Sequence, residues 1–286
     1  MFGKKVQFSS TDYQYSSLPT TRKEAFKDVY RNNFKTILLS GLMLLLFSIP
    51  LIAFLVVMDI GKLGMTPEKF DEEKLRSVLL VWDLIVNSGS VVLLYVVTVG
   101  LMGIMRVLKL LVWQEGIDFL YDFKVGIKEN FKHVSLLYLI FGLIYLGTYS
   151  IYIFLLNFII GIWLILLFIM IFVSLGIWAL YVINIYQTNL GNYLKNAIFF
   201  YSKMMPLTLL FVVLIVFPFF LVFVPINAIT IMIKFPIILV MLIFYYPFLI
   251  IVGYLYSLSK LDEYINKDNY PEIYRKGLYE PNKNDK

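Results

Sequence analysis

The chain has 286 residues, of which 60% are hydrophobic and 15% charged, and its mean hydropathy is +0.81. Soluble domains carry about 45–50% apolar and about 25% charged residues, so this composition excludes a water-soluble fold. The absence of cysteine excludes disulfides and thiolate metal sites, and a lone His133 excludes a site of several imidazoles. No cofactor is expected. The net charge of +6 comes from basic residues beside apolar segments, which indicates a lipid bilayer with anionic headgroups, and no nucleic acid, as the partner.

The apolar segments predict an all-α membrane bundle. The N-terminal segment 1–35 is polar and lacks a signal-peptide pattern, so no cleaved leader is expected. A helix needs about 20 apolar residues to cross a membrane. The uncharged stretch 134–186 holds 53 residues, enough for two crossings with a turn near Asn157 to Gly161. These segments are apolar on every face, which excludes barrel strands. The six predicted spans are 36–58, 84–105, 134–156, 161–186, 206–224 and 236–257, followed by a tail over 258–286.

The loop charges predict the orientation. Of the 25 Lys and Arg residues, 20 lie in segments that share one side of a six-span topology: 1–35, 106–133, 187–205 and 258–286. Basic loops favour the cytoplasmic side, so both termini are predicted to lie in the cytoplasm.

Three segments resemble one another and suggest an internal repeat. Phe26-Lys27 is followed after six residues by Phe34-Lys35, and Phe123-Lys124 by Phe131-Lys132. A weaker third copy runs from Leu194-Lys195 to Ser202-Lys203. Each copy precedes a pair of spans, and 117–132 and 190–201 have amphipathic helical patterns. The prediction is three units of a cytoplasmic interfacial helix plus a hairpin; the alternative is that basic residues before any inward-facing span look alike.

Two stretches also resemble a known family. The first is GLMGIMRVLKLLVWQEG over 100–116 with FKVGIKENFK over 123–132, and the second is YQTNLGNYLKNAIFFYSKMMP over 186–206. Together they resemble the YesL-like family of bacterial membrane proteins, a domain of unknown function, over about 30–260. One departure is the run from Gly100 to Gly103, which lacks the proline usual in that family. The resemblance implies a bacterial plasma-membrane location and an accessory role near carbohydrate uptake, and it carries no known catalytic residues.

The first candidate site is an intramembrane polar group of Asp83, Asn87 and Ser88. Asp83 is the only acid close to a span, beside Trp82 at the outer end of the second span. One interpretation is an interfacial carboxylate in an aromatic belt. The alternative is a proton or cation ligand, with Asn87 and Ser88 one turn further in.

The second candidate site lies on the connector between the second and third spans. The candidate residues of this cytoplasmic interface are Glu115, Asp118, Asp122, Phe123 and Phe131. A soluble partner or an ion could bind there, and the alternative is a solvated helix face. Gly89, Gly100 and Gly103 give the second span a small-residue face, which favours close helix packing.

The function predicted from the sequence is accessory: partnering or regulating a solute-uptake system, with a membrane transporter complex as partner. The alternative is a stand-alone transporter or channel for a small neutral solute. No hydrolase elbow, phosphate loop or metal-ligand cluster appears in the sequence, so the chain is not expected to be an enzyme; a membrane enzyme acting on lipid is the least favoured class.

Overall fold

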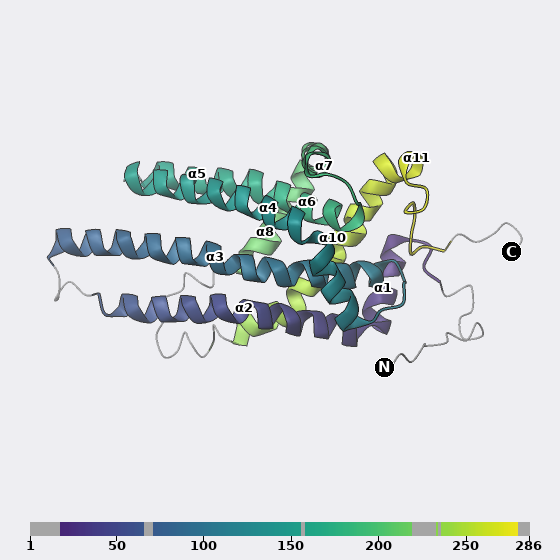
Figure 1. Cartoon of the computed structure of the whole chain (residues 1–286), viewed down its shortest axis with the longest axis horizontal. Coiled ribbons are helices and arrows are strands. Elements are labelled where there is room, and N and C mark those ends of the chain that lie inside the picture. The colour runs from purple at the N-terminus through teal and green to yellow at the C-terminus, as the bar shows by residue number, and fades with distance from the viewer. Residues whose placement is uncertain (1–17, 66–70, 156–157, 219–232, 234–235, 280–286) are drawn as a thin grey trace, which may run out of the picture.

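The computed structural model describes residues 18–65, 71–155, 158–218, 233 and 236–279, which form helices and contain no strand (Figure 1). The all-α fold class is therefore confirmed. In chain order the elements are α1 (Arg22–Asn32), α2 (Phe34–Leu63), α3 (Glu72–Val112), α4 (Phe119–Leu155), α5 (Phe158–Phe168), η2 (Ile169–Val173), α6 (Ser174–Ile185), α7 (Leu190–Lys203), α8 (Met205–Val216), η4 (Met241–Tyr245), α10 (Tyr246–Leu261), η5 (Asp262–Asn266) and α11 (Lys267–Asn269).

Five described helical segments are long and apolar enough to cross a membrane: Phe34–Lys62, Glu72–Val112, Phe119–Ile153, Trp163–Ile185 and Pro236–Asn269. A sixth is present if α7 and α8, bent by 102°, count as one span. The predicted reversal within 134–186 falls between the end of α4 and the start of α5. The predicted fifth span, 206–224, begins with α8, and its end beyond residue 218 lies outside the described residues. The chain is a polytopic helical bundle typical of an integral membrane protein.

The three predicted interfacial segments differ in how they join their spans. The first forms α1, which ends before Asn33, and the third forms α7, which ends before the bend at Met204. The middle segment is not a separate helix, because α4 runs without a break from Phe119 to Leu155. Two of its acids, Asp122 and Glu129, pair with Arg106 of α3. These contacts hold the segment as an extension of its span.

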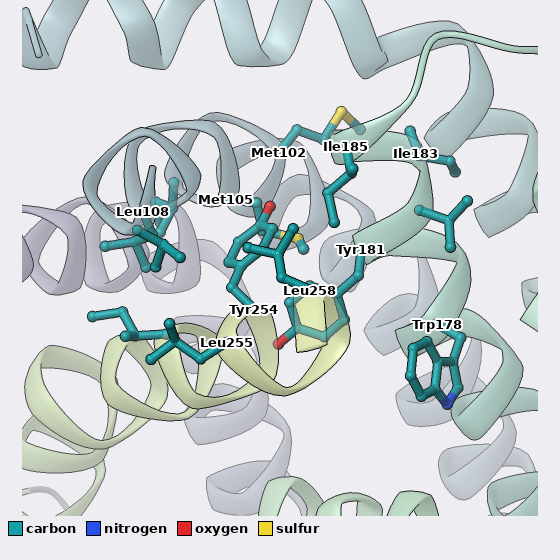
Figure 2. Packing of buried hydrophobic residues seen from close by; sticks show 14 of the residues in the cluster. Met102, Met105, Leu108, Trp178, Tyr181, Ile183, Ile185, Tyr254, Leu255 and Leu258 are labelled. Carbon is teal, nitrogen blue, oxygen red and sulfur yellow. The ribbon is translucent and has the colours of Figure 1, made fainter. Parts of the chain in front are cut away.

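The buried side chains gather at one end of the bundle, called the packed end below. Most of them come from the final part of α3, from α6 and from α10, which are the second helices of the three predicted hairpins. Figure 2 shows Met105, Tyr181 and Tyr254 from these three helices facing a common centre. At the opposite end, called the sparse end, α3 has no buried residue between Glu72 and Val99, and α2, α3 and α5 extend away from the core (Figure 1).

Equivalent positions in the three copies of the predicted repeat are buried. One position before each Phe26, Phe123 or Leu194 is a buried residue: Ala25, Asp122 and Tyr193. Three positions after them the residues are again buried and small, namely Val29, Gly126 and Ala197. The same faces of the three copies thus pack against the core, which supports three related units.

The helices α3 and α4 approach each other closely at Gly103 and Gly126. A Cβ on Gly126 would lie 2.9 Å from the carbonyl oxygen of Met102 and 3.1 Å from Cα of Gly103. A Cβ on Gly103 would lie 2.5 Å from the Phe123 ring. Backbones come this close only where side chains are absent, so the predicted close packing on the small-residue face of the second span is confirmed.

Candidate functional site

The first polar group of the packed end joins α3 to α4. Arg106 on α3 forms an ion pair with Glu129, and its Nε lies 3.8 Å from Oδ1 of Asp122. The Asp122 side chain is 10% exposed and that of Arg106 is 20% exposed. A charge taken out of water is stable only with partners. The pairing of Arg106 with these two carboxylates therefore holds α3 against α4 at this position.

Lys109 lies one turn further along α3 and is buried, with 8% of its surface exposed. Its Nζ donates to the backbone carbonyl of Asn184 at 2.5 Å. That carbonyl belongs to the last turn of α6, where carbonyls lack partners within the helix and carry partial negative charge. The ammonium group therefore caps α6 from a neighbouring helix.

The Asn184 side chain extends this connection to α4. Its Oδ1 accepts from Nδ2 of Asn130 at 3.0 Å, and its own Nδ2 donates to the Leu180 carbonyl at 3.0 Å. Both asparagines are buried: Asn130 is 8% exposed and Asn184 is 4% exposed. We call Arg106, Lys109, Asp122, Glu129, Asn130 and Asn184 the α3–α4–α6 network.

A second polar group joins α1 to η5. Arg22 Nη2 lies 2.6 Å from Oδ2 of Asp262, and both side chains are nearly buried. The other carboxylate oxygen, Oδ1, accepts from Nδ2 of Asn266 at 2.7 Å and from the backbone N–H of Arg275 at 3.2 Å. Tyr186, just after α6, donates its hydroxyl to Asn266 Oδ1. We call Arg22, Tyr186, Asp262 and Asn266 the α1–η5 network.

The segment after α11 links the two networks. Lys276 Nζ lies 2.6 Å from Glu115 and 4.0 Å from the centre of the Trp113 ring, and Lys109 lies 4.7 Å from the same ring. Gly277 has φ +81°, and a Cβ there would lie 2.2 Å from the Val112 carbonyl oxygen. Only glycine fits this left-handed position against the end of α3.

The predicted interface residues have separate environments. Glu115 pairs with Lys276, Asp118 accepts from the backbone N–H of Tyr121 at 3.2 Å, and Asp122 faces Arg106. Phe123 is a core residue, 4% exposed, whereas Phe131 is 47% exposed. The structure therefore leaves Phe131 accessible and places Phe123 and Asp122 in contacts within the chain.

The predicted intramembrane group lies on the sparse part of α3. Asp83 Oδ1 is 3.3 Å from Lys62 Nζ, and the two side chains are 43% and 50% exposed. Asn87 donates to the backbone carbonyl of Asp83 at 2.8 Å and accepts from the Tyr145 hydroxyl at 2.8 Å. Ser88 lines a shallow apolar depression with Phe54 and other side chains. Asp83 and Asn87 are thus connected, and Ser88 is not bonded to either.

Sequence reasoning missed most of the packed end. The candidate residues taken from the sequence include neither Asn184, which is 4% exposed, nor Lys109, Asp262 and Asn266. One signal was present: Asn184 is an amide near the end of a 53-residue stretch without charge. Its partner Lys109 lies 75 residues earlier, a separation that local patterns do not reveal.

Several polar side chains of the apolar helices are already engaged in hydrogen bonds within the protein. Ser48, Thr148 and Ser150 donate to carbonyls one turn back in their own helices. Tyr95 shares a hydrogen bond with Ser135 at 2.7 Å, which links α3 to α4. Within the described residues, no group of three or more His, Asp or Glu side chains could hold a metal ion.

Comparison with protein-family models, curated proteins and solved structures finds no match for this chain. The resemblance to the YesL-like family therefore stays a prediction.

Proposed function

We propose that this integral membrane protein is an accessory component that partners or regulates a solute-uptake system, with carbohydrate the solute class implied by the YesL-like resemblance. Its packed end lies in the cytoplasm, as the basic segments favour. There it presents a stiff surface to a transporter complex.

The observation that supports this role is the α3–α4–α6 network. A carrier needs charged or polar groups that exchange partners along a path. Here Arg106 is paired with carboxylates on α4, and Lys109 caps α6, so the strongest polar groups hold three helices together. Such bonds favour a fixed scaffold over a moving one.

The exposed first turn of α4 is the part of this scaffold best suited to a partner. Leu120 and Tyr121 are 62% and 65% exposed, beside the exposed carboxylate residue Asp118. Apolar side chains next to a charge are typical of a protein contact.

The test separates an accessory role from transport by the chain itself. Carbohydrate uptake is measured in cells with and without the protein, and in liposomes that contain only the purified full chain. We expect uptake to fall in cells without it, no uptake in the liposomes, and co-purification of a transporter complex in mild detergent.

A Leu120→Asp/Tyr121→Asp variant should lose the complex while keeping its thermal unfolding midpoint, because both side chains are exposed. Lys128→Asp serves as a control that introduces the same side chain at another exposed position of the same helix. Saturable uptake by the purified chain alone would instead support the stand-alone transporter. Unchanged cellular uptake without the protein would contradict both functions.

A further inference from the structure

The three repeat units each expose a pair of lysines at the packed end. In every unit the two lysines are eight residues apart, and all six are exposed: Lys27 and Lys35, Lys124 and Lys132, Lys195 and Lys203. No ion pair joins any of them to an acid among the described residues. The lysine pairs therefore recur without an acidic partner in the part of the chain that the structure describes.

The second lysine of each pair marks the start of an apolar segment. Lys35 lies in α2 and Lys132 in α4, and each directly precedes the uncharged part of its helix. Lys203 ends α7, and α8 begins two residues later. Because the apolar part of each helix lies in hydrocarbon, these ammonium groups lie at the depth of the lipid headgroups.

Exposed aromatic and aliphatic side chains accompany the lysines. Phe26 and Tyr30 on α1 and Phe34 at the start of α2 form a row with ring centres about 6 Å apart, and Tyr30 and Phe34 are 43% and 44% exposed. Phe131 on α4 and Ile198 on α7 are 47% and 52% exposed. A helix facing only water would not favour these side chains, whereas a membrane interface does.

On α1 the cations form a longer row. Lys23, Lys27 and Arg31 are spaced by four residues and are all exposed, so they follow one side of α1 beside the aromatic row. The exposed Lys35 follows in the first turn of α2. Figure 1 places α1 and α7 at the same end of the bundle.

We propose that three exposed lysine pairs form a belt that binds anionic phospholipid headgroups around the packed end: the pair on α1 and the start of α2, the pair on the first part of α4, and the pair on α7. The ammonium groups contact lipid phosphates, and the neighbouring aromatic and aliphatic side chains enter the acyl boundary. This belt is independent of the proposed uptake role.

The test measures how strongly spin-labelled phosphatidylglycerol, relative to spin-labelled phosphatidylcholine, associates with the purified full chain in phosphatidylcholine bilayers. A variant with all six lysines replaced by Gln should lose at least about fivefold of this preference, the change expected for one cation near the membrane surface. A six-Arg variant should keep the preference, because it keeps the charge. Raising the salt concentration should weaken the wild-type preference.

Control variants make the result specific. Lys62→Gln, Lys74→Gln and Arg76→Gln together remove cations at the sparse end, where Lys62 and Lys74 already pair with acids, and should leave the preference unchanged. If the unfolding midpoint of the six-Gln variant drops in neutral detergent, the test uses variants in which only one lysine pair is changed, such as Lys27→Gln/Lys35→Gln. An unchanged preference in the six-Gln and paired variants would overturn the belt. So would an equal loss in the sparse-end control, or competition by inorganic phosphate at matched ionic strength.

Discussion

The two ends of α3 have opposite environments although they belong to one continuous helix. Residues from Gly100 to Val112 are mostly buried, and their charged members Arg106 and Lys109 bond to other helices. Residues from Glu72 to Val99 include none that is buried, and the acid among them nearest the apolar segment, Asp83, pairs with a half-exposed Lys62.

This difference shows where the bundle is held together. Lipid tails are as apolar as leucine, so apolar side chains alone give little preference for one helix arrangement. Close backbone contact and buried polar bonds do, and both concentrate at the packed end in Gly103, Gly126 and the two networks. We therefore expect matched substitutions at the two ends to differ in their effect on stability.

The largest effect is expected for Asp262→Ala. This change leaves Arg22 nearly buried without its carboxylate and removes the acceptor of Asn266 and of the Arg275 backbone N–H. Breaking a buried ion pair from one side costs about 3–5 kcal/mol. Unfolding in mixed micelles, followed by circular dichroism, measures the loss.

The neighbouring Glu263→Ala is the control for that experiment. Glu263 pairs with Lys260 three residues away, and its side chain is 50% exposed, so its removal should leave the free energy of unfolding nearly unchanged. Equal losses for the two variants would show that burial does not distinguish the α1–η5 network from a surface pair.

The presence and order of the long apolar helices could be predicted because they depend on local composition. The uncharged stretch 134–186 gave two spans with a reversal, and the structure ends α4 at Leu155 and begins α5 at Phe158. The small-residue face was also predictable, since Gly89, Gly100 and Gly103 share one side of a helix and each would clash with an aromatic ring if it carried a Cβ.

The networks could not be predicted in the same way. Arg22 and Asp262 are 240 residues apart, and Asn130 and Asn184 are 54 residues apart. Their pairing depends on which helices pack together. The amphipathic periodicity of each helix does not show which other helix it contacts. For the same reason Phe123 was grouped with Phe131, although one faces α3 and the other is exposed.

A smaller effect is expected for glycine substitution along α4. In Gly126→Ala the new Cβ would lie 2.7 Å from Cβ of Arg106 and 2.9 Å from the Met102 carbonyl oxygen, so the helices must separate. Overpacking of this kind costs about 1–3 kcal/mol. Gly147→Ala, on the same helix towards the sparse end, meets no atom within 4 Å and should be neutral or stabilising by up to about 1 kcal/mol. The difference between the two unfolding midpoints measures the contrast, and a loss of stability in Gly147→Ala would show that the sparse end packs more tightly than described.

The smallest effect is expected for Asp83→Asn at the sparse end. Asp83 and Lys62 are about half exposed and 3.3 Å apart, so their pairing contributes roughly 0–1 kcal/mol. The Asn87 amide donates to the backbone carbonyl of residue 83, which the substitution retains. A carboxylate that mediates proton coupling would need burial or a changing partner, and an exposed pair offers neither. We therefore expect cellular uptake of candidate sugars between about pH 5 and pH 8 to match the wild type at equal protein level. A flattened pH profile or lost uptake would show that Asp83 takes part in transport. The substitution should not unfold the protein, so unfolding would not explain such a loss.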